Sequence, residues 1–312
     1  MAKIAVELER ALRRRAVNGT PGHAAPRIVA QGDGWTVADV VCTSGPEDRP
    51  FEEQHTHYAI AVVVAGTFQY RSPLGHGVMT PGGLMLGNPG QCYECGHDHG
   101  RGDRCVAFWY APESFERLAA DVGARGAGAR FRVPRLPALR AWSPLVARAA
   151  EGATGSRDVA WEELGVRLAA LALGASSGSG RDDRPLPLNA AAQVTQAVRL
   201  IERHPDASLT LSRLAQDARL SPYHFLRTFE RLTGVTPHQF IMRARLREAA
   251  MRLAGEQGSV LDIALDCGFG DVSNFNRAFR SEFGVSPSAY RQPNRTDTHG
   301  RNHGDRRDRS PT

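Results

Sequence analysis

The 312-residue sequence has almost no lysine. Of its 39 basic residues, only Lys3 is not an arginine. Because this scarcity runs through the whole chain, it indicates a codon bias toward G and C rather than a dedicated binding surface. The formal net charge is nevertheless +6 and the pI about 9.4. Such a balance suits a polyanionic partner without identifying one.

Long apolar runs are also missing. No segment approaches the roughly 20 apolar residues that cross a bilayer, so neither a transmembrane helix nor a membrane partner is expected. The first 16 residues mix acidic with apolar side chains and lack a small-residue cleavage site, which favours an amphipathic helix over a signal peptide. With 41% apolar and 23% charged residues, the sequence is typical of a soluble globular protein. We expect it to be cytoplasmic.

Cysteine is scarce, and its five residues make an odd number: Cys42, Cys92, Cys95, Cys105 and Cys267. An odd number in a cytoplasmic chain disfavours a disulfide framework. Free cysteines serve as small buried apolar residues, metal ligands or redox-active thiols.

Changes in residue pattern divide the chain into five segments. Residues 1–25 are expected to form a short helix and a mobile arm. Segment 26–176 begins with short β-branched runs punctuated by glycine and proline, which predict a sandwich or barrel, and ends in helices. Composition makes 177–188 a linker and 293–312 a disordered tail, with an all-helical domain at 189–292 between them. The predicted fold class is α+β multidomain.

One predicted helix of the first domain carries an apolar stripe at 3-4 spacing, formed by Trp161, Leu164, Leu168 and Leu171. Two interpretations remain open for it. The stripe packs on the strands of its own domain, or it pairs with its copy in another subunit.

The helical segment contains one short pattern twice. "FLRTFERLTGVTPHQF" begins at Phe225 and "FNRAFRSEFGVSPSAY" at Phe275, each with a glycine stop and a proline restart. Upstream of the turn the two copies align at an offset of 49 residues, and beyond it at 50, so the second turn is one residue longer. Two short helices joined by such a turn form a helix-turn-helix. The repeat therefore predicts two of these units, with second helices at about 221–233 and 271–283.

A connecting helix of about 18 residues is predicted between the two units. At about 1.5 Å per residue it spans about 27 Å. Adding the width of the flanking units separates the two second helices by roughly one turn of B-DNA, about 34 Å. Helices so placed can enter successive major grooves on one face of a duplex.

These motifs carry a family resemblance over residues 190–292. "SPYHFLRTFERLTGVTPHQF", "RARLREAAMRLAG" and "IALDCGFGDVSNFNRAFRSEFGVSPSAYR" resemble the DNA-binding domain of the AraC/XylS family of bacterial transcription regulators. The resemblance implies a sequence-specific regulator that binds promoter or operator DNA. The candidate partners that it implies are a small-molecule effector, a second subunit in a homodimer and, for an activator, RNA polymerase; the existence of an effector and the oligomeric state both remain open. Activator and repressor both remain open.

The resemblance also implies which side chains face DNA. Arginine forks can bind guanine or phosphate, asparagine can read adenine, and serine suits phosphate oxygens. The ten expected contact residues are Ser221, Tyr223, His224, Leu226, Arg227, Thr228, Ser273, Asn274, Asn276 and Arg277. One departure is Arg219, which stands where the family usually has glycine in the first turn. A left-handed arginine costs about 1–2 kcal/mol there, whereas the second unit keeps Gly268.

The family commonly places a cupin-like β-barrel in front, for effector sensing or dimerisation. "HTHYAIAVVVAGTFQYRS" followed by "GVMTPGGLMLGNPG" loosely resembles the two-part cupin layout. Metal-binding cupins offer His-x-His and a glutamate, then a further histidine. Here His55 and His57 supply the first pair, no glutamate follows at the usual spacing, and Leu86 stands at the position of the last histidine. We therefore expect no enzyme, with a metal-dependent cupin enzyme as the alternative.

A second group of ligand-type residues lies in "CYECGHDHGRGDRC". Cysteine and histidine at this spacing suit zinc or another borderline-soft metal. The residues are Cys92, Cys95, His97, His99 and Cys105. Only one CxxC is present, so metal binding, thiol-based redox sensing and a purely structural role all remain open. No cofactor is required, and a metal ion in the N-terminal domain is the alternative.

Overall fold

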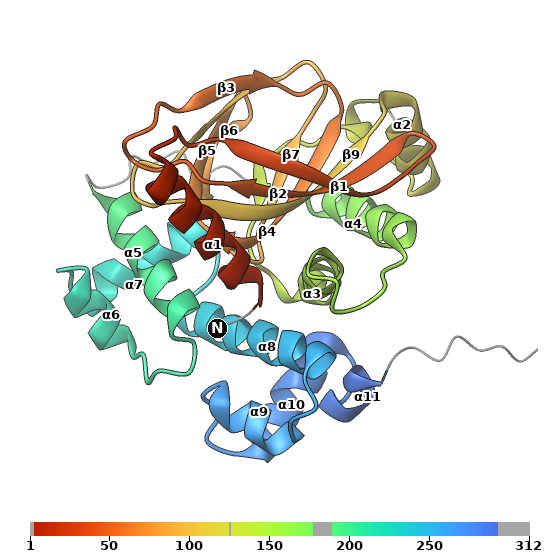
Figure 1. The fold of residues 1–312 in the computed structure, drawn as a ribbon. Helices are drawn as coiled ribbons and strands as arrows, with labels where there is room; N and C mark the ends of the chain where they lie inside the picture. Colours follow the sequence, from red (N-terminus) through yellow and green to blue (C-terminus); the bar gives the residue numbers. More distant parts are fainter. Residues whose placement is uncertain (1–2, 125, 177–188, 293–312) are drawn as a thin grey trace, which may run out of the picture.

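The computed structural model describes residues 3–124, 126–176 and 189–292, so the predicted linker at 177–188 and tail at 293–312 lie outside the described residues. The described chain forms a β-rich domain with helices, followed by a helical part that packs beneath it (Figure 1). Within these ranges, none of the helices combines the length and apolar character that a bilayer crossing requires.

Two antiparallel sheets form the β-rich domain. The larger has the strand order β1-β2-β9-β4-β7-β10, and the smaller β3-β8-β5-β6. The strands of the larger sheet are β1 (Ala24–Gly32), β2 (Trp35–Cys42), β4 (Tyr58–Gly66), β7 (Leu84–Gly87), β9 (Asp103–Tyr110) and β10 (Arg135–Leu136). Those of the smaller sheet are β3 (Phe51–Gln54), β5 (Phe68–Ser72), β6 (Gly75–Met79) and β8 (Cys92–Gly96). Because the strands divide into two separate sheets, the barrel expected from the sequence is not closed.

The central strand β4 is buried along nearly its whole length because both faces of the large sheet are covered. Val63 faces the small sheet and packs with Phe68 and Tyr70 in a shared core. Val62, on the opposite face, packs with helical residues such as Leu168 in a second core. Alternation along the strand thus places successive side chains in different cores.

Helices flank the sheets on the side of the second core. They are α1 (Lys3–Asn18), α2 (Pro112–Asp121), α3 (Ser143–Ala153) and α4 (Trp161–Ser176), with 3₁₀ turns η1 (Gly126–Ala129) and η2 (Arg140–Trp142). In α4, Leu164 and Leu168 pack on the large sheet, whereas Leu171 is 38% exposed. The apolar stripe is therefore used within its own domain, except at Leu171.

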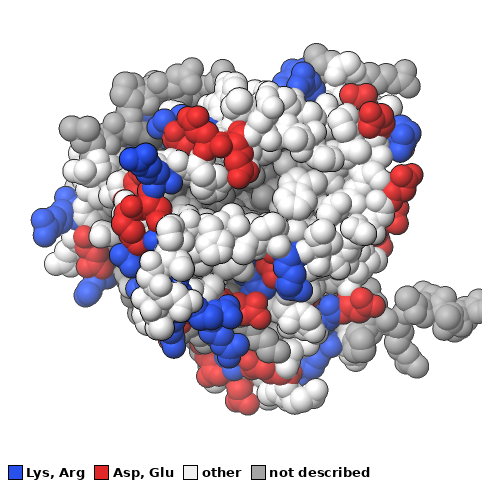
Figure 2. Space-filling model, turned by 45° about the horizontal axis from the view of Figure 1, so that its top comes forward, with Lys and Arg blue, Asp and Glu red and all other residues white. Residues whose placement is uncertain are grey.

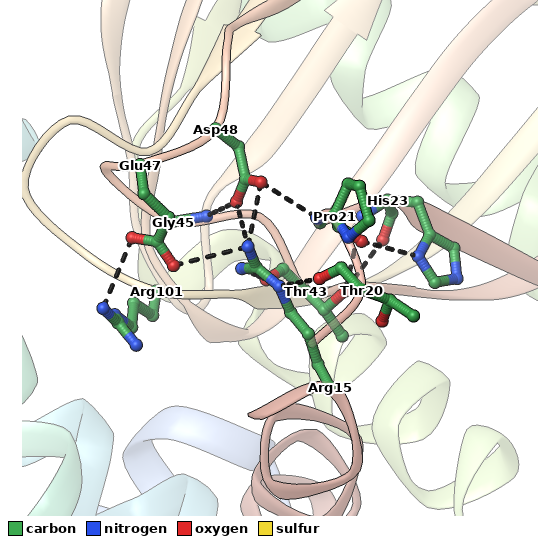
Figure 3. A network of polar contacts seen from close by, with 10 residues as sticks. Arg15, Thr20, Pro21, His23, Thr43, Gly45, Glu47, Asp48 and Arg101 are labelled. Atoms are coloured by element: carbon green, nitrogen blue, oxygen red, sulfur yellow. Dashed lines mark hydrogen bonds and ion pairs between the residues drawn. The ribbon is translucent and has the colours of Figure 1, made fainter. Parts of the chain in front are cut away.

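The N-terminal helix is docked, which corrects the expectation of a mobile arm. Leu8 of α1 is buried. At the other end of the helix, Arg15 donates to the carbonyl oxygens of Thr20 (3.0 Å) and Thr43 (2.6 Å) and pairs with Asp48 (2.7 Å), as Figure 3 shows. The segment after α1 continues into β1, so it is held at both ends.

Seven helices follow in the C-terminal part. They are α5 (Ala190–Arg203), α6 (Leu211–Asp217), α7 (Pro222–Thr233), α8 (Pro237–Gly255), α9 (Val260–Asp266), α10 (Val272–Phe283) and α11 (Pro287–Arg291). The 19-residue α8 matches the predicted connecting helix, and a capping box between Thr236 and Gln239 fixes its start. Its first half shares a core with α5, α6 and α7, and its second half with α9, α10 and α11.

The two predicted turns share one backbone conformation. Arg219 has φ +56° and Gly268 has φ +85°, so both lie in the left-handed region. In each turn, the residue after the left-handed one donates its backbone N–H to a carbonyl oxygen of the preceding short helix. Leu220 N donates to Ala215 O (2.9 Å), and Phe269 N donates to Ala264 O (3.1 Å). The second turn is one residue longer, as the offsets predict. Arginine thus occupies a conformation that favours glycine.

Replacing Arg219 by glycine should stabilise the protein by about 1 kcal/mol, because it removes the left-handed strain while glycine loses more backbone entropy on folding. Gly268→Ala should instead destabilise it by more than about 1 kcal/mol. A Cβ there would lie 2.7 Å from the backbone oxygen of Asp206. Urea unfolding followed by circular dichroism measures both changes. A lower unfolding midpoint for Arg219→Gly would contradict the strain argument.

Candidate nucleic-acid interface

Helices α7 and α10 each bury one face and expose the other. Phe225 and Phe229 of α7 are fully buried, as are Phe275 and Phe279 of α10, so aromatic residues at i and i+4 fix the inward side of each helix. The polar residues between them face solvent. The two helices occupy equivalent places on either half of α8.

Most of the residues predicted on α7 are accessible. Ser221, Tyr223, His224 and Arg227 are exposed, with Tyr223 at 65%, and Leu226 is half-buried. The prediction that Thr228 faces outward is wrong. Thr228 is 7% exposed because it lies three residues after Phe225 and next to Phe229, on the packed side of the helix.

Two of the exposed residues at the start of α7, Ser221 and His224, are hydrogen-bonded to each other. Ser221 is the N-cap: its Oγ accepts from the His224 backbone N (3.3 Å) and lies 2.8 Å from His224 Nδ1. Arg227 has no hydrogen bond or ion pair with any described residue, so its guanidinium is available to a ligand.

On α10 all four predicted residues are exposed: Ser273, Asn274, Asn276 and Arg277. Asp271 caps this helix by accepting from the Asn274 backbone N (2.7 Å), a role that the sequence interpretation missed although Asp is a common N-cap. Arg277 Nη2 donates to Asn274 Oδ1 (3.2 Å). This pair orients one edge of the guanidinium and leaves its other donors free.

Arg245 of α8 is a second residue that the sequence did not single out. It donates to three backbone oxygens, those of Pro205 (2.6 Å), Ala207 (2.9 Å) and Gly268 (2.7 Å). The first two lie in the α5–α6 loop and the third in the turn before α10. One side chain therefore ties the two helix pairs together. Burial lowers the pKa of Arg245, and the negative charge of Asp206 opposes that shift.

The far ends of the second helix pair are held by the β-rich domain. Glu282, near the end of α10, accepts from Ser143 Oγ of α3 and pairs with Arg243 Nε of α8 (3.3 Å). In α11, the Tyr290 hydroxyl donates to the buried Glu151 of α3 (2.5 Å). The N-terminal end of α10, which carries the predicted contact residues, is left open.

The C-terminal part carries a modest positive excess, with 13 arginines against 10 acidic residues in 189–292. On the face drawn in Figure 2, basic and acidic side chains are interspersed. Arginine pairing also reduces the free charge: Arg247 binds Glu202 (2.6 Å), and Arg252 binds both Glu256 and Asp266 (2.9 Å each). Arg227 and Arg277 differ from these because neither has a carboxylate partner among the described residues.

The cupin-type histidines do not converge. The ring of His55 is buried, stacks on Tyr93 with centroids 4.1 Å apart, and places Nε2 3.0 Å from the Tyr70 hydroxyl. His57 is exposed, and its Nδ1 lies 2.8 Å from Thr56 Oγ1. The two histidines therefore do not face one metal ion, which disfavours the alternative of a metal-dependent cupin, because one is used in the core and the other lies at the surface.

The Cys/His group after β7 also divides. Cys92 and His99 are exposed, whereas Cys95, His97 and Cys105 are buried. Burial raises the pKa of the Cys95 and Cys105 thiols well above the usual range. The five residues therefore do not form one shared site, and of the three roles left open for them, a common metal site is disfavoured for the exposed Cys92 and His99.

His55 should make stability depend on pH. Burial lowers its pKa from 6.5 to about 4. As pH falls from about 6.5 toward 4, the unfolded chain takes up a proton that the folded chain does not. The free energy of unfolding should therefore fall by up to about 3 kcal/mol over this range. Urea unfolding at a series of pH values measures it. His55→Gln should flatten the dependence and the exposed control His57→Gln should not; equal slopes for all three proteins would refute the assignment.

The chain was compared with known proteins. A helix-turn-helix domain family model matches residues 214–293. The HTH-type transcriptional activator RhaS of Salmonella arizonae is 30% identical over 193 residues, which cover 59% of this chain and 67% of RhaS. The Probable transcriptional regulator LumQ of Photobacterium leiognathi is 36% identical over 90 residues, 29% of this chain but only 36% of its own length.

Parts of the chain are also similar to solved structures. A transcriptional regulator from Chromobacterium violaceum, titled as containing an AraC-type DNA-binding domain, is 27% identical with a TM-score of 0.31. The match covers 32% of this chain and 88% of that one. The sequence relationship to RhaS extends beyond the helical part into the preceding domain. The chain therefore belongs to the AraC/XylS family of DNA-binding transcription regulators.

Proposed function

We propose that this regulator binds promoter or operator DNA through two helix-turn-helix units, α6–α7 and α9–α10, with α7 and α10 in successive major grooves. The observation that carries the proposal is the exposed, polar N-terminal end of each helix on opposite halves of one rod. At about 1.5 Å per residue, the 19 residues of α8 span about 28 Å. With the flanking helices, this separation suits one turn of B-DNA, about 34 Å.

Within this arrangement the two arginines carry most of the contact chemistry. Arg227 and Arg277 bind guanine edges or phosphates, and Asn274 and Asn276 read adenine. Ser273 and Tyr223 bind the backbone. Ser221 and His224 reach DNA only after exchanging their mutual hydrogen bond, so they contribute less.

The first domain serves effector sensing or dimerisation in this proposal. We take its two packed sheets as cupin-like in layout. The proposed segments of the chain are 1–25, 26–176, 177–188, 189–292 and 293–312. RhaS is named a transcriptional activator. If this chain acts in the same sense, RNA polymerase is a further partner in the cytoplasm. The exposed Leu171 offers one point for contact with a second subunit.

A metal-dependent cupin enzyme is not proposed. Its ligand set would need His55 and His57 on one ion, and His55 is held instead by Tyr70 and Tyr93. At the position of the further histidine, Leu86 is fully buried in the apolar core.

Binding in two successive major grooves requires two half-sites at a fixed spacing on one face of the duplex, and this spacing can be tested. A target selected from a random duplex pool and mapped by footprinting should show two protected half-sites one helical turn apart. Inserting about 5 base pairs between them turns one half-site to the opposite face of the duplex. This should abolish the gain in affinity that the second half-site gives over a single half-site. Inserting a full turn should also weaken binding, because α8 fixes the distance. Unchanged affinity after the half-turn insertion would refute binding by both units.

Arg277→Ala should weaken binding to the selected target by about 1–3 kcal/mol if the guanidinium binds a base edge, and relax specificity at that position. Gel-shift titration at fixed salt measures the change. The control is Arg167→Ala, which removes an equally exposed arginine, 64% accessible, from α4. A loss of affinity equal to that of the control would remove Arg277 from the interface.

A further inference from the structure

The β-rich domain contains a buried polar cluster that joins His97 and Asp103, from the Cys/His segment 92–105, to Cys42, which no sequence motif connected with them. Sγ of Cys42, a ring nitrogen of His97 and a carboxylate oxygen of Asp103 all lie within 4.8 Å of one another. All three residues are buried. Such a group is costly inside an apolar core unless each polar atom finds a partner.

Sheet register brings these residues together. Cys42 is the last residue of β2 and pairs directly with Asp103, the first residue of β9. His97 follows the end of β8 in the opposing sheet. The cluster thus lies where the two sheets meet, and its members are up to 61 residues apart in the chain.

The protein does not satisfy this cluster completely. His97 Nε2 lies 2.7 Å from Asp103 Oδ1, and Cys105 Sγ donates to Asp103 Oδ2 (3.3 Å). The other ring nitrogen, His97 Nδ1, is buried and has no partner in normal hydrogen-bond geometry among the described residues; the Cys42 thiol is a polar group that lies near the ring. A buried polar atom left without a partner is destabilising.

The donors match one class of ligand. Thiolate sulfur, imidazole nitrogen and carboxylate oxygen are the atoms that bind zinc, and cysteine selects against hard cations such as magnesium and calcium. Three donors already lie within 4.8 Å of each other. A tetrahedral site needs a fourth, and Cys105, hydrogen-bonded to Asp103, stands beside them.

We propose that Cys42, His97 and Asp103, with Cys105 as fourth ligand, bind a divalent transition metal ion of the zinc class. On binding, both thiols and the protonated His97 ring release their protons to solvent, and the metal replaces the contacts that now join the Asp103 carboxylate to His97 and Cys105. The site differs from the cupin layout, since it uses neither His55 nor His57. It also excludes the exposed Cys92 and His99.

The site is joined to the helical part of the chain by a short loop. His97 and Asp103 are the two ends of the β8–β9 connection, and within it the Arg101 carbonyl oxygen accepts from Arg199 Nη2 of α5 (3.0 Å). Figure 3 shows how the Arg101 side chain pairs with Glu47, which in turn pairs with Arg15 of α1. Metal binding at both ends of the loop therefore stiffens a contact between the two parts of the protein.

The test is metal titration of the full-length protein after treatment with a chelator. Cobalt(II) should bind with one-to-one stoichiometry and give the intense near-ultraviolet absorption of thiolate-to-cobalt charge transfer. Zinc should displace it and raise the unfolding temperature. Cys42→Ala should lower metal affinity at least about tenfold. The control is Cys92→Ala, which removes the exposed cysteine at the start of β8. This variant should bind cobalt with the affinity of the wild type.

Folding is checked separately by circular dichroism of the metal-free variants, and Asp103→Asn, which keeps the size of the side chain, repeats the test if Cys42→Ala does not fold. A cobalt spectrum without charge-transfer absorption, or wild-type affinity in Cys42→Ala, overturns the proposal and leaves His97 and Asp103 as a buried ion pair. Loss of binding in Cys92→Ala overturns it equally, because the metal would then lie elsewhere.

Discussion

The relative position of the two helix pairs depends on one side chain, the partly buried guanidinium of Arg245. Arg245 joins the α5–α6 loop to the turn before α10 through three backbone oxygens. The same turn presses Gly268 against the backbone of Asp206, where a side chain would not fit. Because backbone groups cannot change rotamer, these contacts fix the two helix pairs relative to each other more firmly than side-chain packing along α8 alone. A planar, always-charged donor with five N–H groups is suited to this task, and lysine would satisfy fewer of the carbonyls.

The helix α8 serves both parts of the protein. Its buried face supports the two helix pairs, while Arg243 reaches the Ala138 carbonyl oxygen (2.9 Å) and Glu282, and so links η2, α3 and α10. The β-rich domain grips the C-terminal end of α10 and leaves the opposite end open. Polar contacts thus join α3 to α10 and α11, at the end of α10 that lies away from the predicted contact residues.

Local patterns in the sequence were enough to predict the repeat, the unequal turns and the length of α8, and they marked Arg219 as a departure from the usual glycine without deciding its backbone conformation. Each of these depends on residues within one turn or one helix. The predictions that failed depend on tertiary neighbours. Thr228 was assigned to the wrong face because helical periodicity does not define where a buried stripe ends, and the arrangement of two open sheets depends on strand pairing. Cys42 and Asp103 meet only through the register of β2 and β9, and Arg245 looks like any other arginine in an arginine-rich chain.

The one-residue difference between the turns has a further consequence. The two helix pairs are not copies related by symmetry: they differ in turn length, in N-cap residue and in the polar side chains that they expose. A duplex bound by both would present two unlike half-sites to a single chain. Such a target has a direction, so one molecule can lie on it in only one orientation, with its β-rich domain toward a defined end of the promoter. If both helix pairs bind DNA as proposed, polarity along the duplex is a property of the monomer and does not require a second subunit.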